Sequence, residues 1–138
     1  MDSFLSSPPH LIQLEASFIW YFTNSWRSDE RRRKYEGNSF EAIQEALSSY
    51  VEGIEVDVRI SKDGIPFIFH GINLEEATNY QGITEENSWE ELKKITYKSA
   101  PHSKLMSLEE LFAIVGNQKY LFLDIKSARI NISTGRQF

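Results

Sequence analysis

The stretch GIEVDVRISKDGIPFIFHG, residues 53–71, predicts two β-strands joined by a tight turn. Apolar and polar residues alternate over residues 54–60, which is the period of a strand whose two faces have different surroundings. Asp63 and Gly64 form a dipeptide typical of turns, and residues 65–70 are a second apolar run. The two strands could pair as a hairpin or could follow one another in a larger sheet.

Two acids in the first of these strands share one face. Glu55 and Asp57 are two residues apart, so both side chains point to the same side of the strand. One interpretation is a solvated polar face, which Arg59 would also favour. If both faces of the sheet are covered, the acids would instead be a buried pair that needs a cation, because close carboxylates repel and lose hydration. Oxygen ligands of this kind suit Mg²⁺ or Ca²⁺.

Further polar residues stand near the ends of other predicted strands. Asp124 and Lys126 share one side of the apolar run 119–126 and could be a local ion pair or part of a site. In α/β barrels the chemistry lies at the carboxyl ends of the strands. His70 ends the run 65–70 and could be structural, or could transfer protons, since imidazole exchanges protons readily near neutral pH.

The remaining signals favour an α/β fold in one domain. Capping boxes, in which a polar side chain and an acid three residues later satisfy each other's backbone N–H groups, predict three helices. The pairs are Asn38 with Glu41, Ser88 with Glu91, and Ser107 with Glu110. With another strand at 17–22, strands and helices alternate in the order that favours parallel pairing. We expect an irregular leader at 1–16, a domain at 17–126 and an unpatterned tail at 127–138.

Composition narrows the classes of function. The 138 residues carry a net charge of −5, which argues against a nucleic-acid surface. There are no cysteines, so disulfides and thiolate metal sites are excluded. No run approaches the roughly 20 apolar residues of a transmembrane helix, and no signal peptide is evident. We therefore expect a cytoplasmic location.

Over roughly residues 36–126 the sequence resembles the glycerophosphodiester phosphodiesterase family. The family's E-x-D-V and K-D-G-x-P patterns match residues 55–58 and 62–66, and its E-I-K pattern matches Asp-Ile-Lys at 124–126. The resemblance implies a partial (β/α)₈ TIM barrel, comprising about the first four βα units of a phospholipase C-like phosphodiesterase. It also implies a divalent cation, Mg²⁺ or Ca²⁺, and a small glycerophosphodiester that is hydrolysed to an alcohol and glycerol 3-phosphate.

The same resemblance implies roles for individual residues. Trp26-Arg27-Ser28 is the best match to the family's His-Arg-Gly motif. The implied metal ligands are Glu55, Asp57 and Asp124, the implied acid–base residue is His70, and the implied phosphate contacts are Arg27 and Lys126.

Three hypotheses for the function remain. The chain could be such a hydrolase, and a homo-oligomer or a missing second half could complete a barrel that needs roughly 200–250 residues. It could be a truncated or inactive relative that serves as a binding module, since there is no histidine between His10 and His70. It could also be an unrelated α/β protein whose acids lie on the surface.

Overall fold

The computed structural model describes residues 37–127, 130–131 and 136–137. The expected leader at 1–16 and the expected strand at 17–22 lie outside these residues, as does Arg27. The described elements are α2 (Phe40–Leu47), β1 (Gly53–Ile60), β2 (Pro66–Ile68), the 3₁₀ turns η2 (Leu74–Glu76) and η3 (Thr84–Glu86), α3 (Trp89–Leu92), β3 (Met106–Ser107), α4 (Leu108–Val115), β4 (Tyr120–Ile125), β5 (Ile130–Asn131) and β6 (Arg136–Gln137). None of the described helices is long and apolar enough to cross a membrane.

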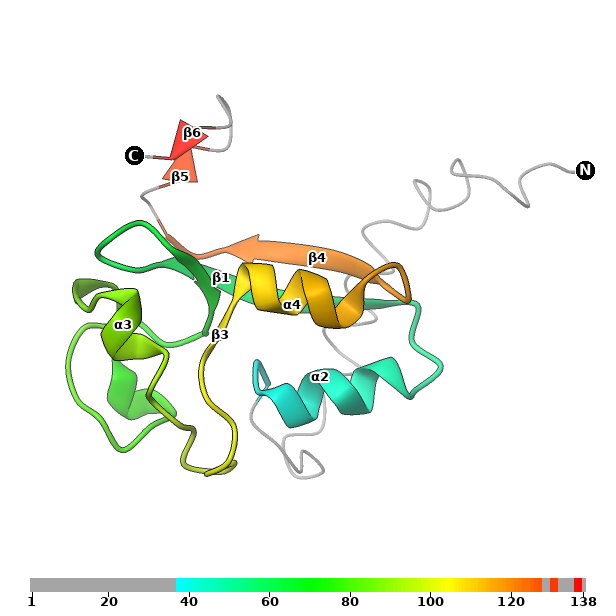
Figure 1. Cartoon of the computed structure of the whole chain (residues 1–138), viewed down its shortest axis with the longest axis horizontal. Coiled ribbons are helices and arrows are strands. Elements are labelled where there is room, and N and C mark those ends of the chain that lie inside the picture. The colour runs from blue at the N-terminus through cyan, green and yellow to red at the C-terminus, as the bar shows by residue number, and fades with distance from the viewer. Residues whose placement is uncertain (1–36, 128–129, 132–135, 138) are drawn as a thin grey trace, which may run out of the picture. The chain divides into compact units, whose positions relative to one another are not determined.

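One mixed sheet organises the fold, with strand order β3-β2-β1-β4 (Figure 1). The hairpin alternative is confirmed, because β1 and β2 are antiparallel with Val58 opposite Ile68. Strands β2 and β3 are also antiparallel. Parallel pairing is confirmed for β1 and β4, where Asp57 lies opposite Asp124. A separate antiparallel pair is formed by β5 and β6.

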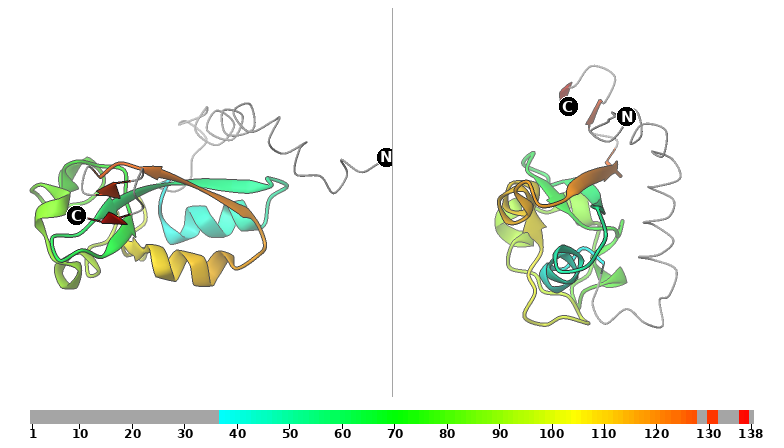
Figure 2. Two further views of the ribbon diagram at one scale, coloured as in Figure 1. Left: turned by 90° about the horizontal axis from the view of Figure 1, so that it is seen from above. Right: turned by 90° about the vertical axis from the view of Figure 1, so that its right-hand side faces the viewer.

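The apolar face of β1 forms the core with two helices. Figure 2 shows α2 and α4 on the same side of the β1–β4 pair. Alternate residues of β1 are almost fully buried beneath them, and each buried aliphatic side chain contributes about 1.5–3 kcal/mol. The buried residues of this layer are Ile54, Val56, Val58 and Ile60 of β1, Ala42, Ile43 and Ala46 of α2, and Leu111 and Val115 of α4.

The helix caps follow the sequence signals with one exception. The boxes at Ser88 and Ser107 are confirmed, each closed by a glutamate three residues later. The box at Asn38 is wrong: Ser39 caps α2, and its hydroxyl accepts a hydrogen bond from the Ala42 N–H at 3.2 Å. The Asn38 side chain is engaged elsewhere, by hydrogen bonds to Asp57.

Residues 61–105 contain a second core beyond the carboxyl end of β1. Aromatic pairs hold it together: the ring centroids of Phe67 and Trp89 are 5.8 Å apart, and those of Phe69 and Tyr97 are 5.9 Å apart. The buried members of this cluster are Phe67, Phe69, Leu74, Leu92, Ile95, Tyr97, Ala100 and Leu105. We call residues 61–105 the lobe; it carries His70 and the two 3₁₀ turns.

A carboxylate joins the β1–β2 turn to the start of α3. Asp63 Oδ1 accepts hydrogen bonds from the Ser61 hydroxyl at 2.6 Å and from the Trp89 N–H at 2.9 Å. The Ser61 hydrogen bond, followed by the Trp89 N–H, lowers the pKa of Asp63 below its usual value of 3.8. A carboxylate whose pKa is lowered by folding stabilises the fold above its unfolded pKa, and this stabilisation disappears as pH falls through the lowered value.

We therefore predict that Asp63→Ala lowers the urea midpoint of unfolding at neutral pH, and that the difference from the wild type shrinks as the pH falls below 3.8 and through the lowered pKa. Glu90→Ala serves as the control, because Glu90 is an exposed α3 carboxylate in a surface ion pair with Lys93. A difference between Asp63→Ala and the wild type that stays constant throughout the acid titration would contradict the role of the Asp63 charge.

Candidate metal centre

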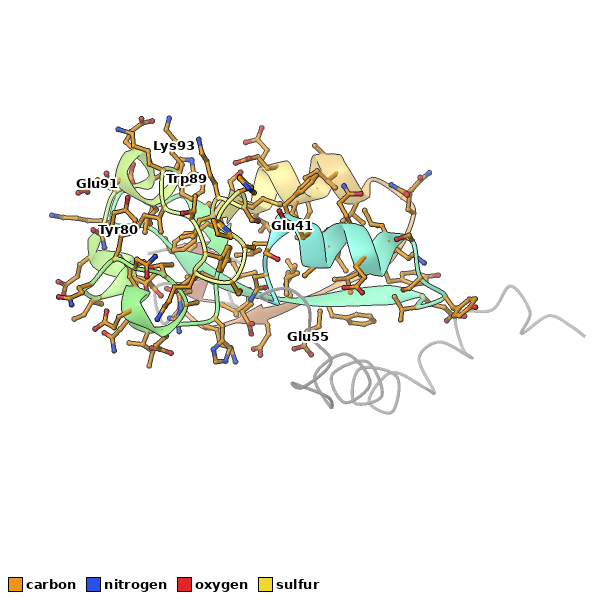
Figure 3. All side chains as sticks on the ribbon, turned by 90° about the horizontal axis from the view of Figure 1, so that it is seen from below. Glu41, Glu55, Tyr80, Trp89, Glu91 and Lys93 are labelled. Carbon is orange, nitrogen blue, oxygen red and sulfur yellow. The ribbon has the colours of Figure 1, made fainter. Side chains whose placement is uncertain are left out.

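Parallel pairing brings three acids together on one face of the sheet. Glu55 and Asp57 share a face of β1, and Figure 3 shows Glu55 projecting from the side away from α2 and α4. Asp124 lies opposite Asp57 in register, and paired strands are about 4.8 Å apart. One carboxylate oxygen from each of the three residues lies within 4.8 Å of the other two. We call these three residues the acidic triad.

Asp57 and Arg59 do not lie on a solvated strand face. Asp57 is 4% exposed and Arg59 is 7% exposed, so the interpretation that these residues form a solvated polar face is wrong. Glu55 is half-buried, whereas the Asp124 side chain is 41% exposed. Three carboxylates at this separation repel one another, and partial burial weakens solvent screening of that repulsion. The arrangement therefore favours binding of a cation.

Asn38 fixes the orientation of the most buried member of the triad. Its Nδ2 donates to Asp57 Oδ2 at 3.0 Å, while its Oδ1 accepts the Asp57 backbone N–H at 3.1 Å. Both bonds are buried and join residues 19 positions apart in the sequence. The capping pattern in the sequence predicts Asn38 as the helix cap and does not indicate this role. The signal was the neighbouring Ser39, which caps a helix equally well and leaves Asn38 available.

Lys126 supplies a resident positive charge beside the triad. Its Nζ lies 2.8 Å from Asp124 Oδ2 and 3.6 Å from Asp57 Oδ1. The predicted ion pair with Asp124 is therefore confirmed, and the ammonium also reaches the buried acid on β1. Among the described residues, the Lys126 ammonium thus lies beside two of the three carboxylates of the triad.

His70 lies just beyond β2, at the edge of the lobe. The N–H of the preceding residue, Phe69, donates to the Asp57 carbonyl at 3.0 Å, which holds this segment against β1. The His70 carbonyl accepts hydrogen bonds from Arg59, and the residue as a whole is exposed. The structure thus brings the His70 backbone near the carboxyl end of β1. Arg27 lies outside the described residues.

The donor set fits a hard divalent cation. Carboxylate oxygens are the ligands that Mg²⁺ and Ca²⁺ prefer, and neither ion requires nitrogen or sulfur ligands. The triad offers at least three such oxygens from two adjacent strands, and Asn38 orients one of the carboxylates from outside. A hydrogen bond from a neighbouring residue to a metal-ligating carboxylate holds that carboxylate in the orientation that the ion needs.

Comparison with known proteins assigns the chain to one family. The model of the glycerophosphoryl diester phosphodiesterase family matches residues 29–136. A glycerophosphodiester phosphodiesterase of Bacillus altitudinis is 30% identical over 97 residues, which cover 67% of this chain and 40% of that protein.

Solved structures of phosphodiesterases also align with this chain. A glycerophosphodiester phosphodiesterase of Thermotoga maritima aligns with a TM-score of 0.59 and 31% identity, over 67% of this chain and 39% of that one. An Oleispira antarctica phosphodiesterase, solved in complex with the product sn-glycerol-3-phosphate, aligns with a TM-score of 0.62 and 25% identity, over 66% and 39% of the two chains.

The chain thus spans 39–40% of the length of these relatives, and its mixed sheet corresponds to part of their barrel. The family model covers well over half of the sequence. The chain therefore belongs to the glycerophosphoryl diester phosphodiesterase family, as a partial barrel of that fold.

Proposed function

We propose that the chain is part of a cation-dependent phosphodiester hydrolase, with glycerophosphodiesters as substrates and glycerol 3-phosphate as a product. The convergence of Glu55, Asp57 and Asp124 beside Lys126 supports the proposal most strongly. The site lies where the parallel strands β1 and β4 approach their carboxyl ends, the position that active sites occupy in α/β barrels.

The chemistry of the residues matches the needs of phosphodiester hydrolysis. A phosphodiester is anionic, and the reaction places further negative charge on its phosphoryl oxygens. A cation held by the triad would supply Lewis-acid stabilisation of that charge. Lys126 would contact a phosphate oxygen from the same side, and Arg27 would be a second phosphate contact. His70 would donate a proton to the departing alkoxide as a general acid.

A second candidate is a relative that binds the cation or the phosphate without turnover. His70 and His102 are the histidines among the described residues, and His102 lies exposed in the loop before β3. The second acid–base group would therefore come from elsewhere. Because the chain spans 39–40% of its relatives' length, a complete barrel wall would need residues beyond those that the structure describes.

Cation binding is the first test. Adding Mg²⁺ or Ca²⁺ at a hundredfold excess over its dissociation constant should stabilise the native state by about 2.7 kcal/mol, measured by thermal unfolding. Asp57→Asn should remove most of this stabilisation. Glu109→Gln makes the same change of charge on an exposed α4 residue and should retain it. An equal response in Asp57→Asn and the wild type would exclude the triad as the binding site.

The orienting role of Asn38 predicts a smaller loss. Asn38→Ala deletes the two bonds to Asp57 and should weaken cation affinity by about 10–100-fold, measured by titration calorimetry. The exposed Asn79 provides a matched control, and Asn79→Ala should bind as the wild type does. Unchanged affinity in Asn38→Ala would show that Asp57 needs no orienting partner.

Turnover separates the two candidate functions. In a coupled assay for glycerol 3-phosphate with glycerophosphocholine, His70→Ala should reduce cation-dependent release by about 10²–10⁴-fold if His70 acts as the general acid. His102→Ala should have no effect. Cation binding without any release by the wild-type chain would favour the binding module, and release unaffected by His70→Ala would refute the role of His70.

A further inference from the structure

A second buried polar network lies next to the triad, built around Arg59. Arg59 follows Asp57 by two residues on β1, and its side chain is only 8% exposed. Its Nη2 and Nε donate to the His70 carbonyl at 2.8 and 3.3 Å. Its Nη1 donates to Glu85 Oε2 at 3.1 Å. One guanidinium therefore joins β1 to His70, two residues beyond β2, and to η3.

The network continues to the residue that follows Lys126. Glu85 Oε1 accepts a hydrogen bond from the Ser127 hydroxyl at 2.7 Å, and Ser127 is 5% exposed. The Lys126 N–H donates to the Val58 carbonyl at 2.9 Å, so the chain beyond β4 is already held against β1 at this level. Glu85 thus bridges the arginine of one strand and the serine beyond its parallel neighbour.

The planar guanidinium of Arg59 fixes the directions of the hydrogen bonds in this network. A guanidinium is a rigid planar fork, and its charge-assisted hydrogen bonds are about twice as strong as neutral ones. Burial makes a loss of partners costly, since breaking a buried pair leaves an uncompensated charge. A lysine would retain the charge of Arg59 but could not reproduce three donors in one plane. The position of the His70 carbonyl therefore depends on the fork and on charge together.

We propose that Arg59, Glu85 and Ser127 are positioning residues, which set the His70 backbone against the carboxyl ends of β1 and β4. We call these three residues the frame. The purpose of this placement rests on the proposed function, in which His70 handles a proton. The frame itself rests on the described hydrogen bonds alone. Arg59 donates its hydrogen bonds to His70 and Glu85. A change in the frame should therefore move His70 and leave cation binding at the triad intact.

Two variants of the full chain test the frame. Arg59→Lys keeps the charge and removes the planar set of donors, and Ser127→Ala removes the hydroxyl that donates to Glu85. In both, the His70 imidazole resonance should shift in NMR spectra while that of the exposed His102 stays in place. Amide exchange should also accelerate about tenfold in the lobe segment that follows His70, at Leu74 and Thr84, whose N–H groups donate to Gly82 and Ile72.

The controls separate a local effect from a general loss of stability. Exchange at the Ile43 amide, which donates to Ser39 in α2, should stay at the wild-type rate, and cation affinity should stay within about twofold. Lys93→Arg is the matched control substitution, in an exposed ion pair of the lobe. It should change neither the His70 resonance nor the amide exchange rates at Leu74 and Thr84.

An unchanged His70 resonance in both frame variants would overturn the proposal. Acceleration of Ile43 equal to that of Leu74 and Thr84 would also overturn it, because the frame would then be a general stabilising contact. These readouts need no turnover and no bound cation. Failure of the wild-type chain to bind Mg²⁺ or Ca²⁺ would refute the proposed metal site and is thereby distinct from failure of the frame.

Discussion

Mutual repulsion among the carboxylates of Glu55, Asp57 and Asp124 is the constraint on which the site depends. The parallel register of β1 and β4 sets Asp57 opposite Asp124, and the strand period adds Glu55 to the same face. Like charges held this close are unfavourable in a partly buried setting unless positive charge is brought to them. Lys126 supplies part of that charge, and the remaining oxygens form a ligand set for a divalent cation.

The two faces of β1 have different roles: one packs in the core, and the other carries the charged residues of the site. One face carries only aliphatic residues and packs beneath α2 and α4, which fixes the strand in place (Figure 2). The other face carries Glu55, Asp57 and Arg59, of which Asp57 is held by Asn38 and Arg59 by His70 and Glu85. A rigid apolar layer behind a polar face allows charged groups to be positioned within the tolerance that a metal site or catalysis needs. The lobe adds His70 to the same end of the strand.

Local patterns in the sequence predicted much of this arrangement. Alternation in residues 54–60 placed Glu55 and Asp57 on a common face, and the boxes at Ser88 and Ser107 located α3 and α4. Each of these features depends on residues close together in the chain, so periodicity and capping rules are sufficient to predict them.

Other features depended on contacts that local patterns do not contain. The charge of Arg59 favoured a solvated strand face. Arg59 is nevertheless buried, because His70 and Glu85, 11 and 26 residues away, accept hydrogen bonds from its guanidinium. Asn38 and Ser39 are equally good caps, and only the tertiary contact with Asp57 decides between them. The resemblance to a family indicated which acids converge, and the parallel register explains why they can.

A crystal structure of the full chain grown with Ca²⁺ would test the convergence of the triad most directly. We expect one strong density peak at about 2.3–2.6 Å from a carboxylate oxygen of each of Glu55, Asp57 and Asp124. A calcium ion bound elsewhere, with these three side chains turned away from one another, would contradict it.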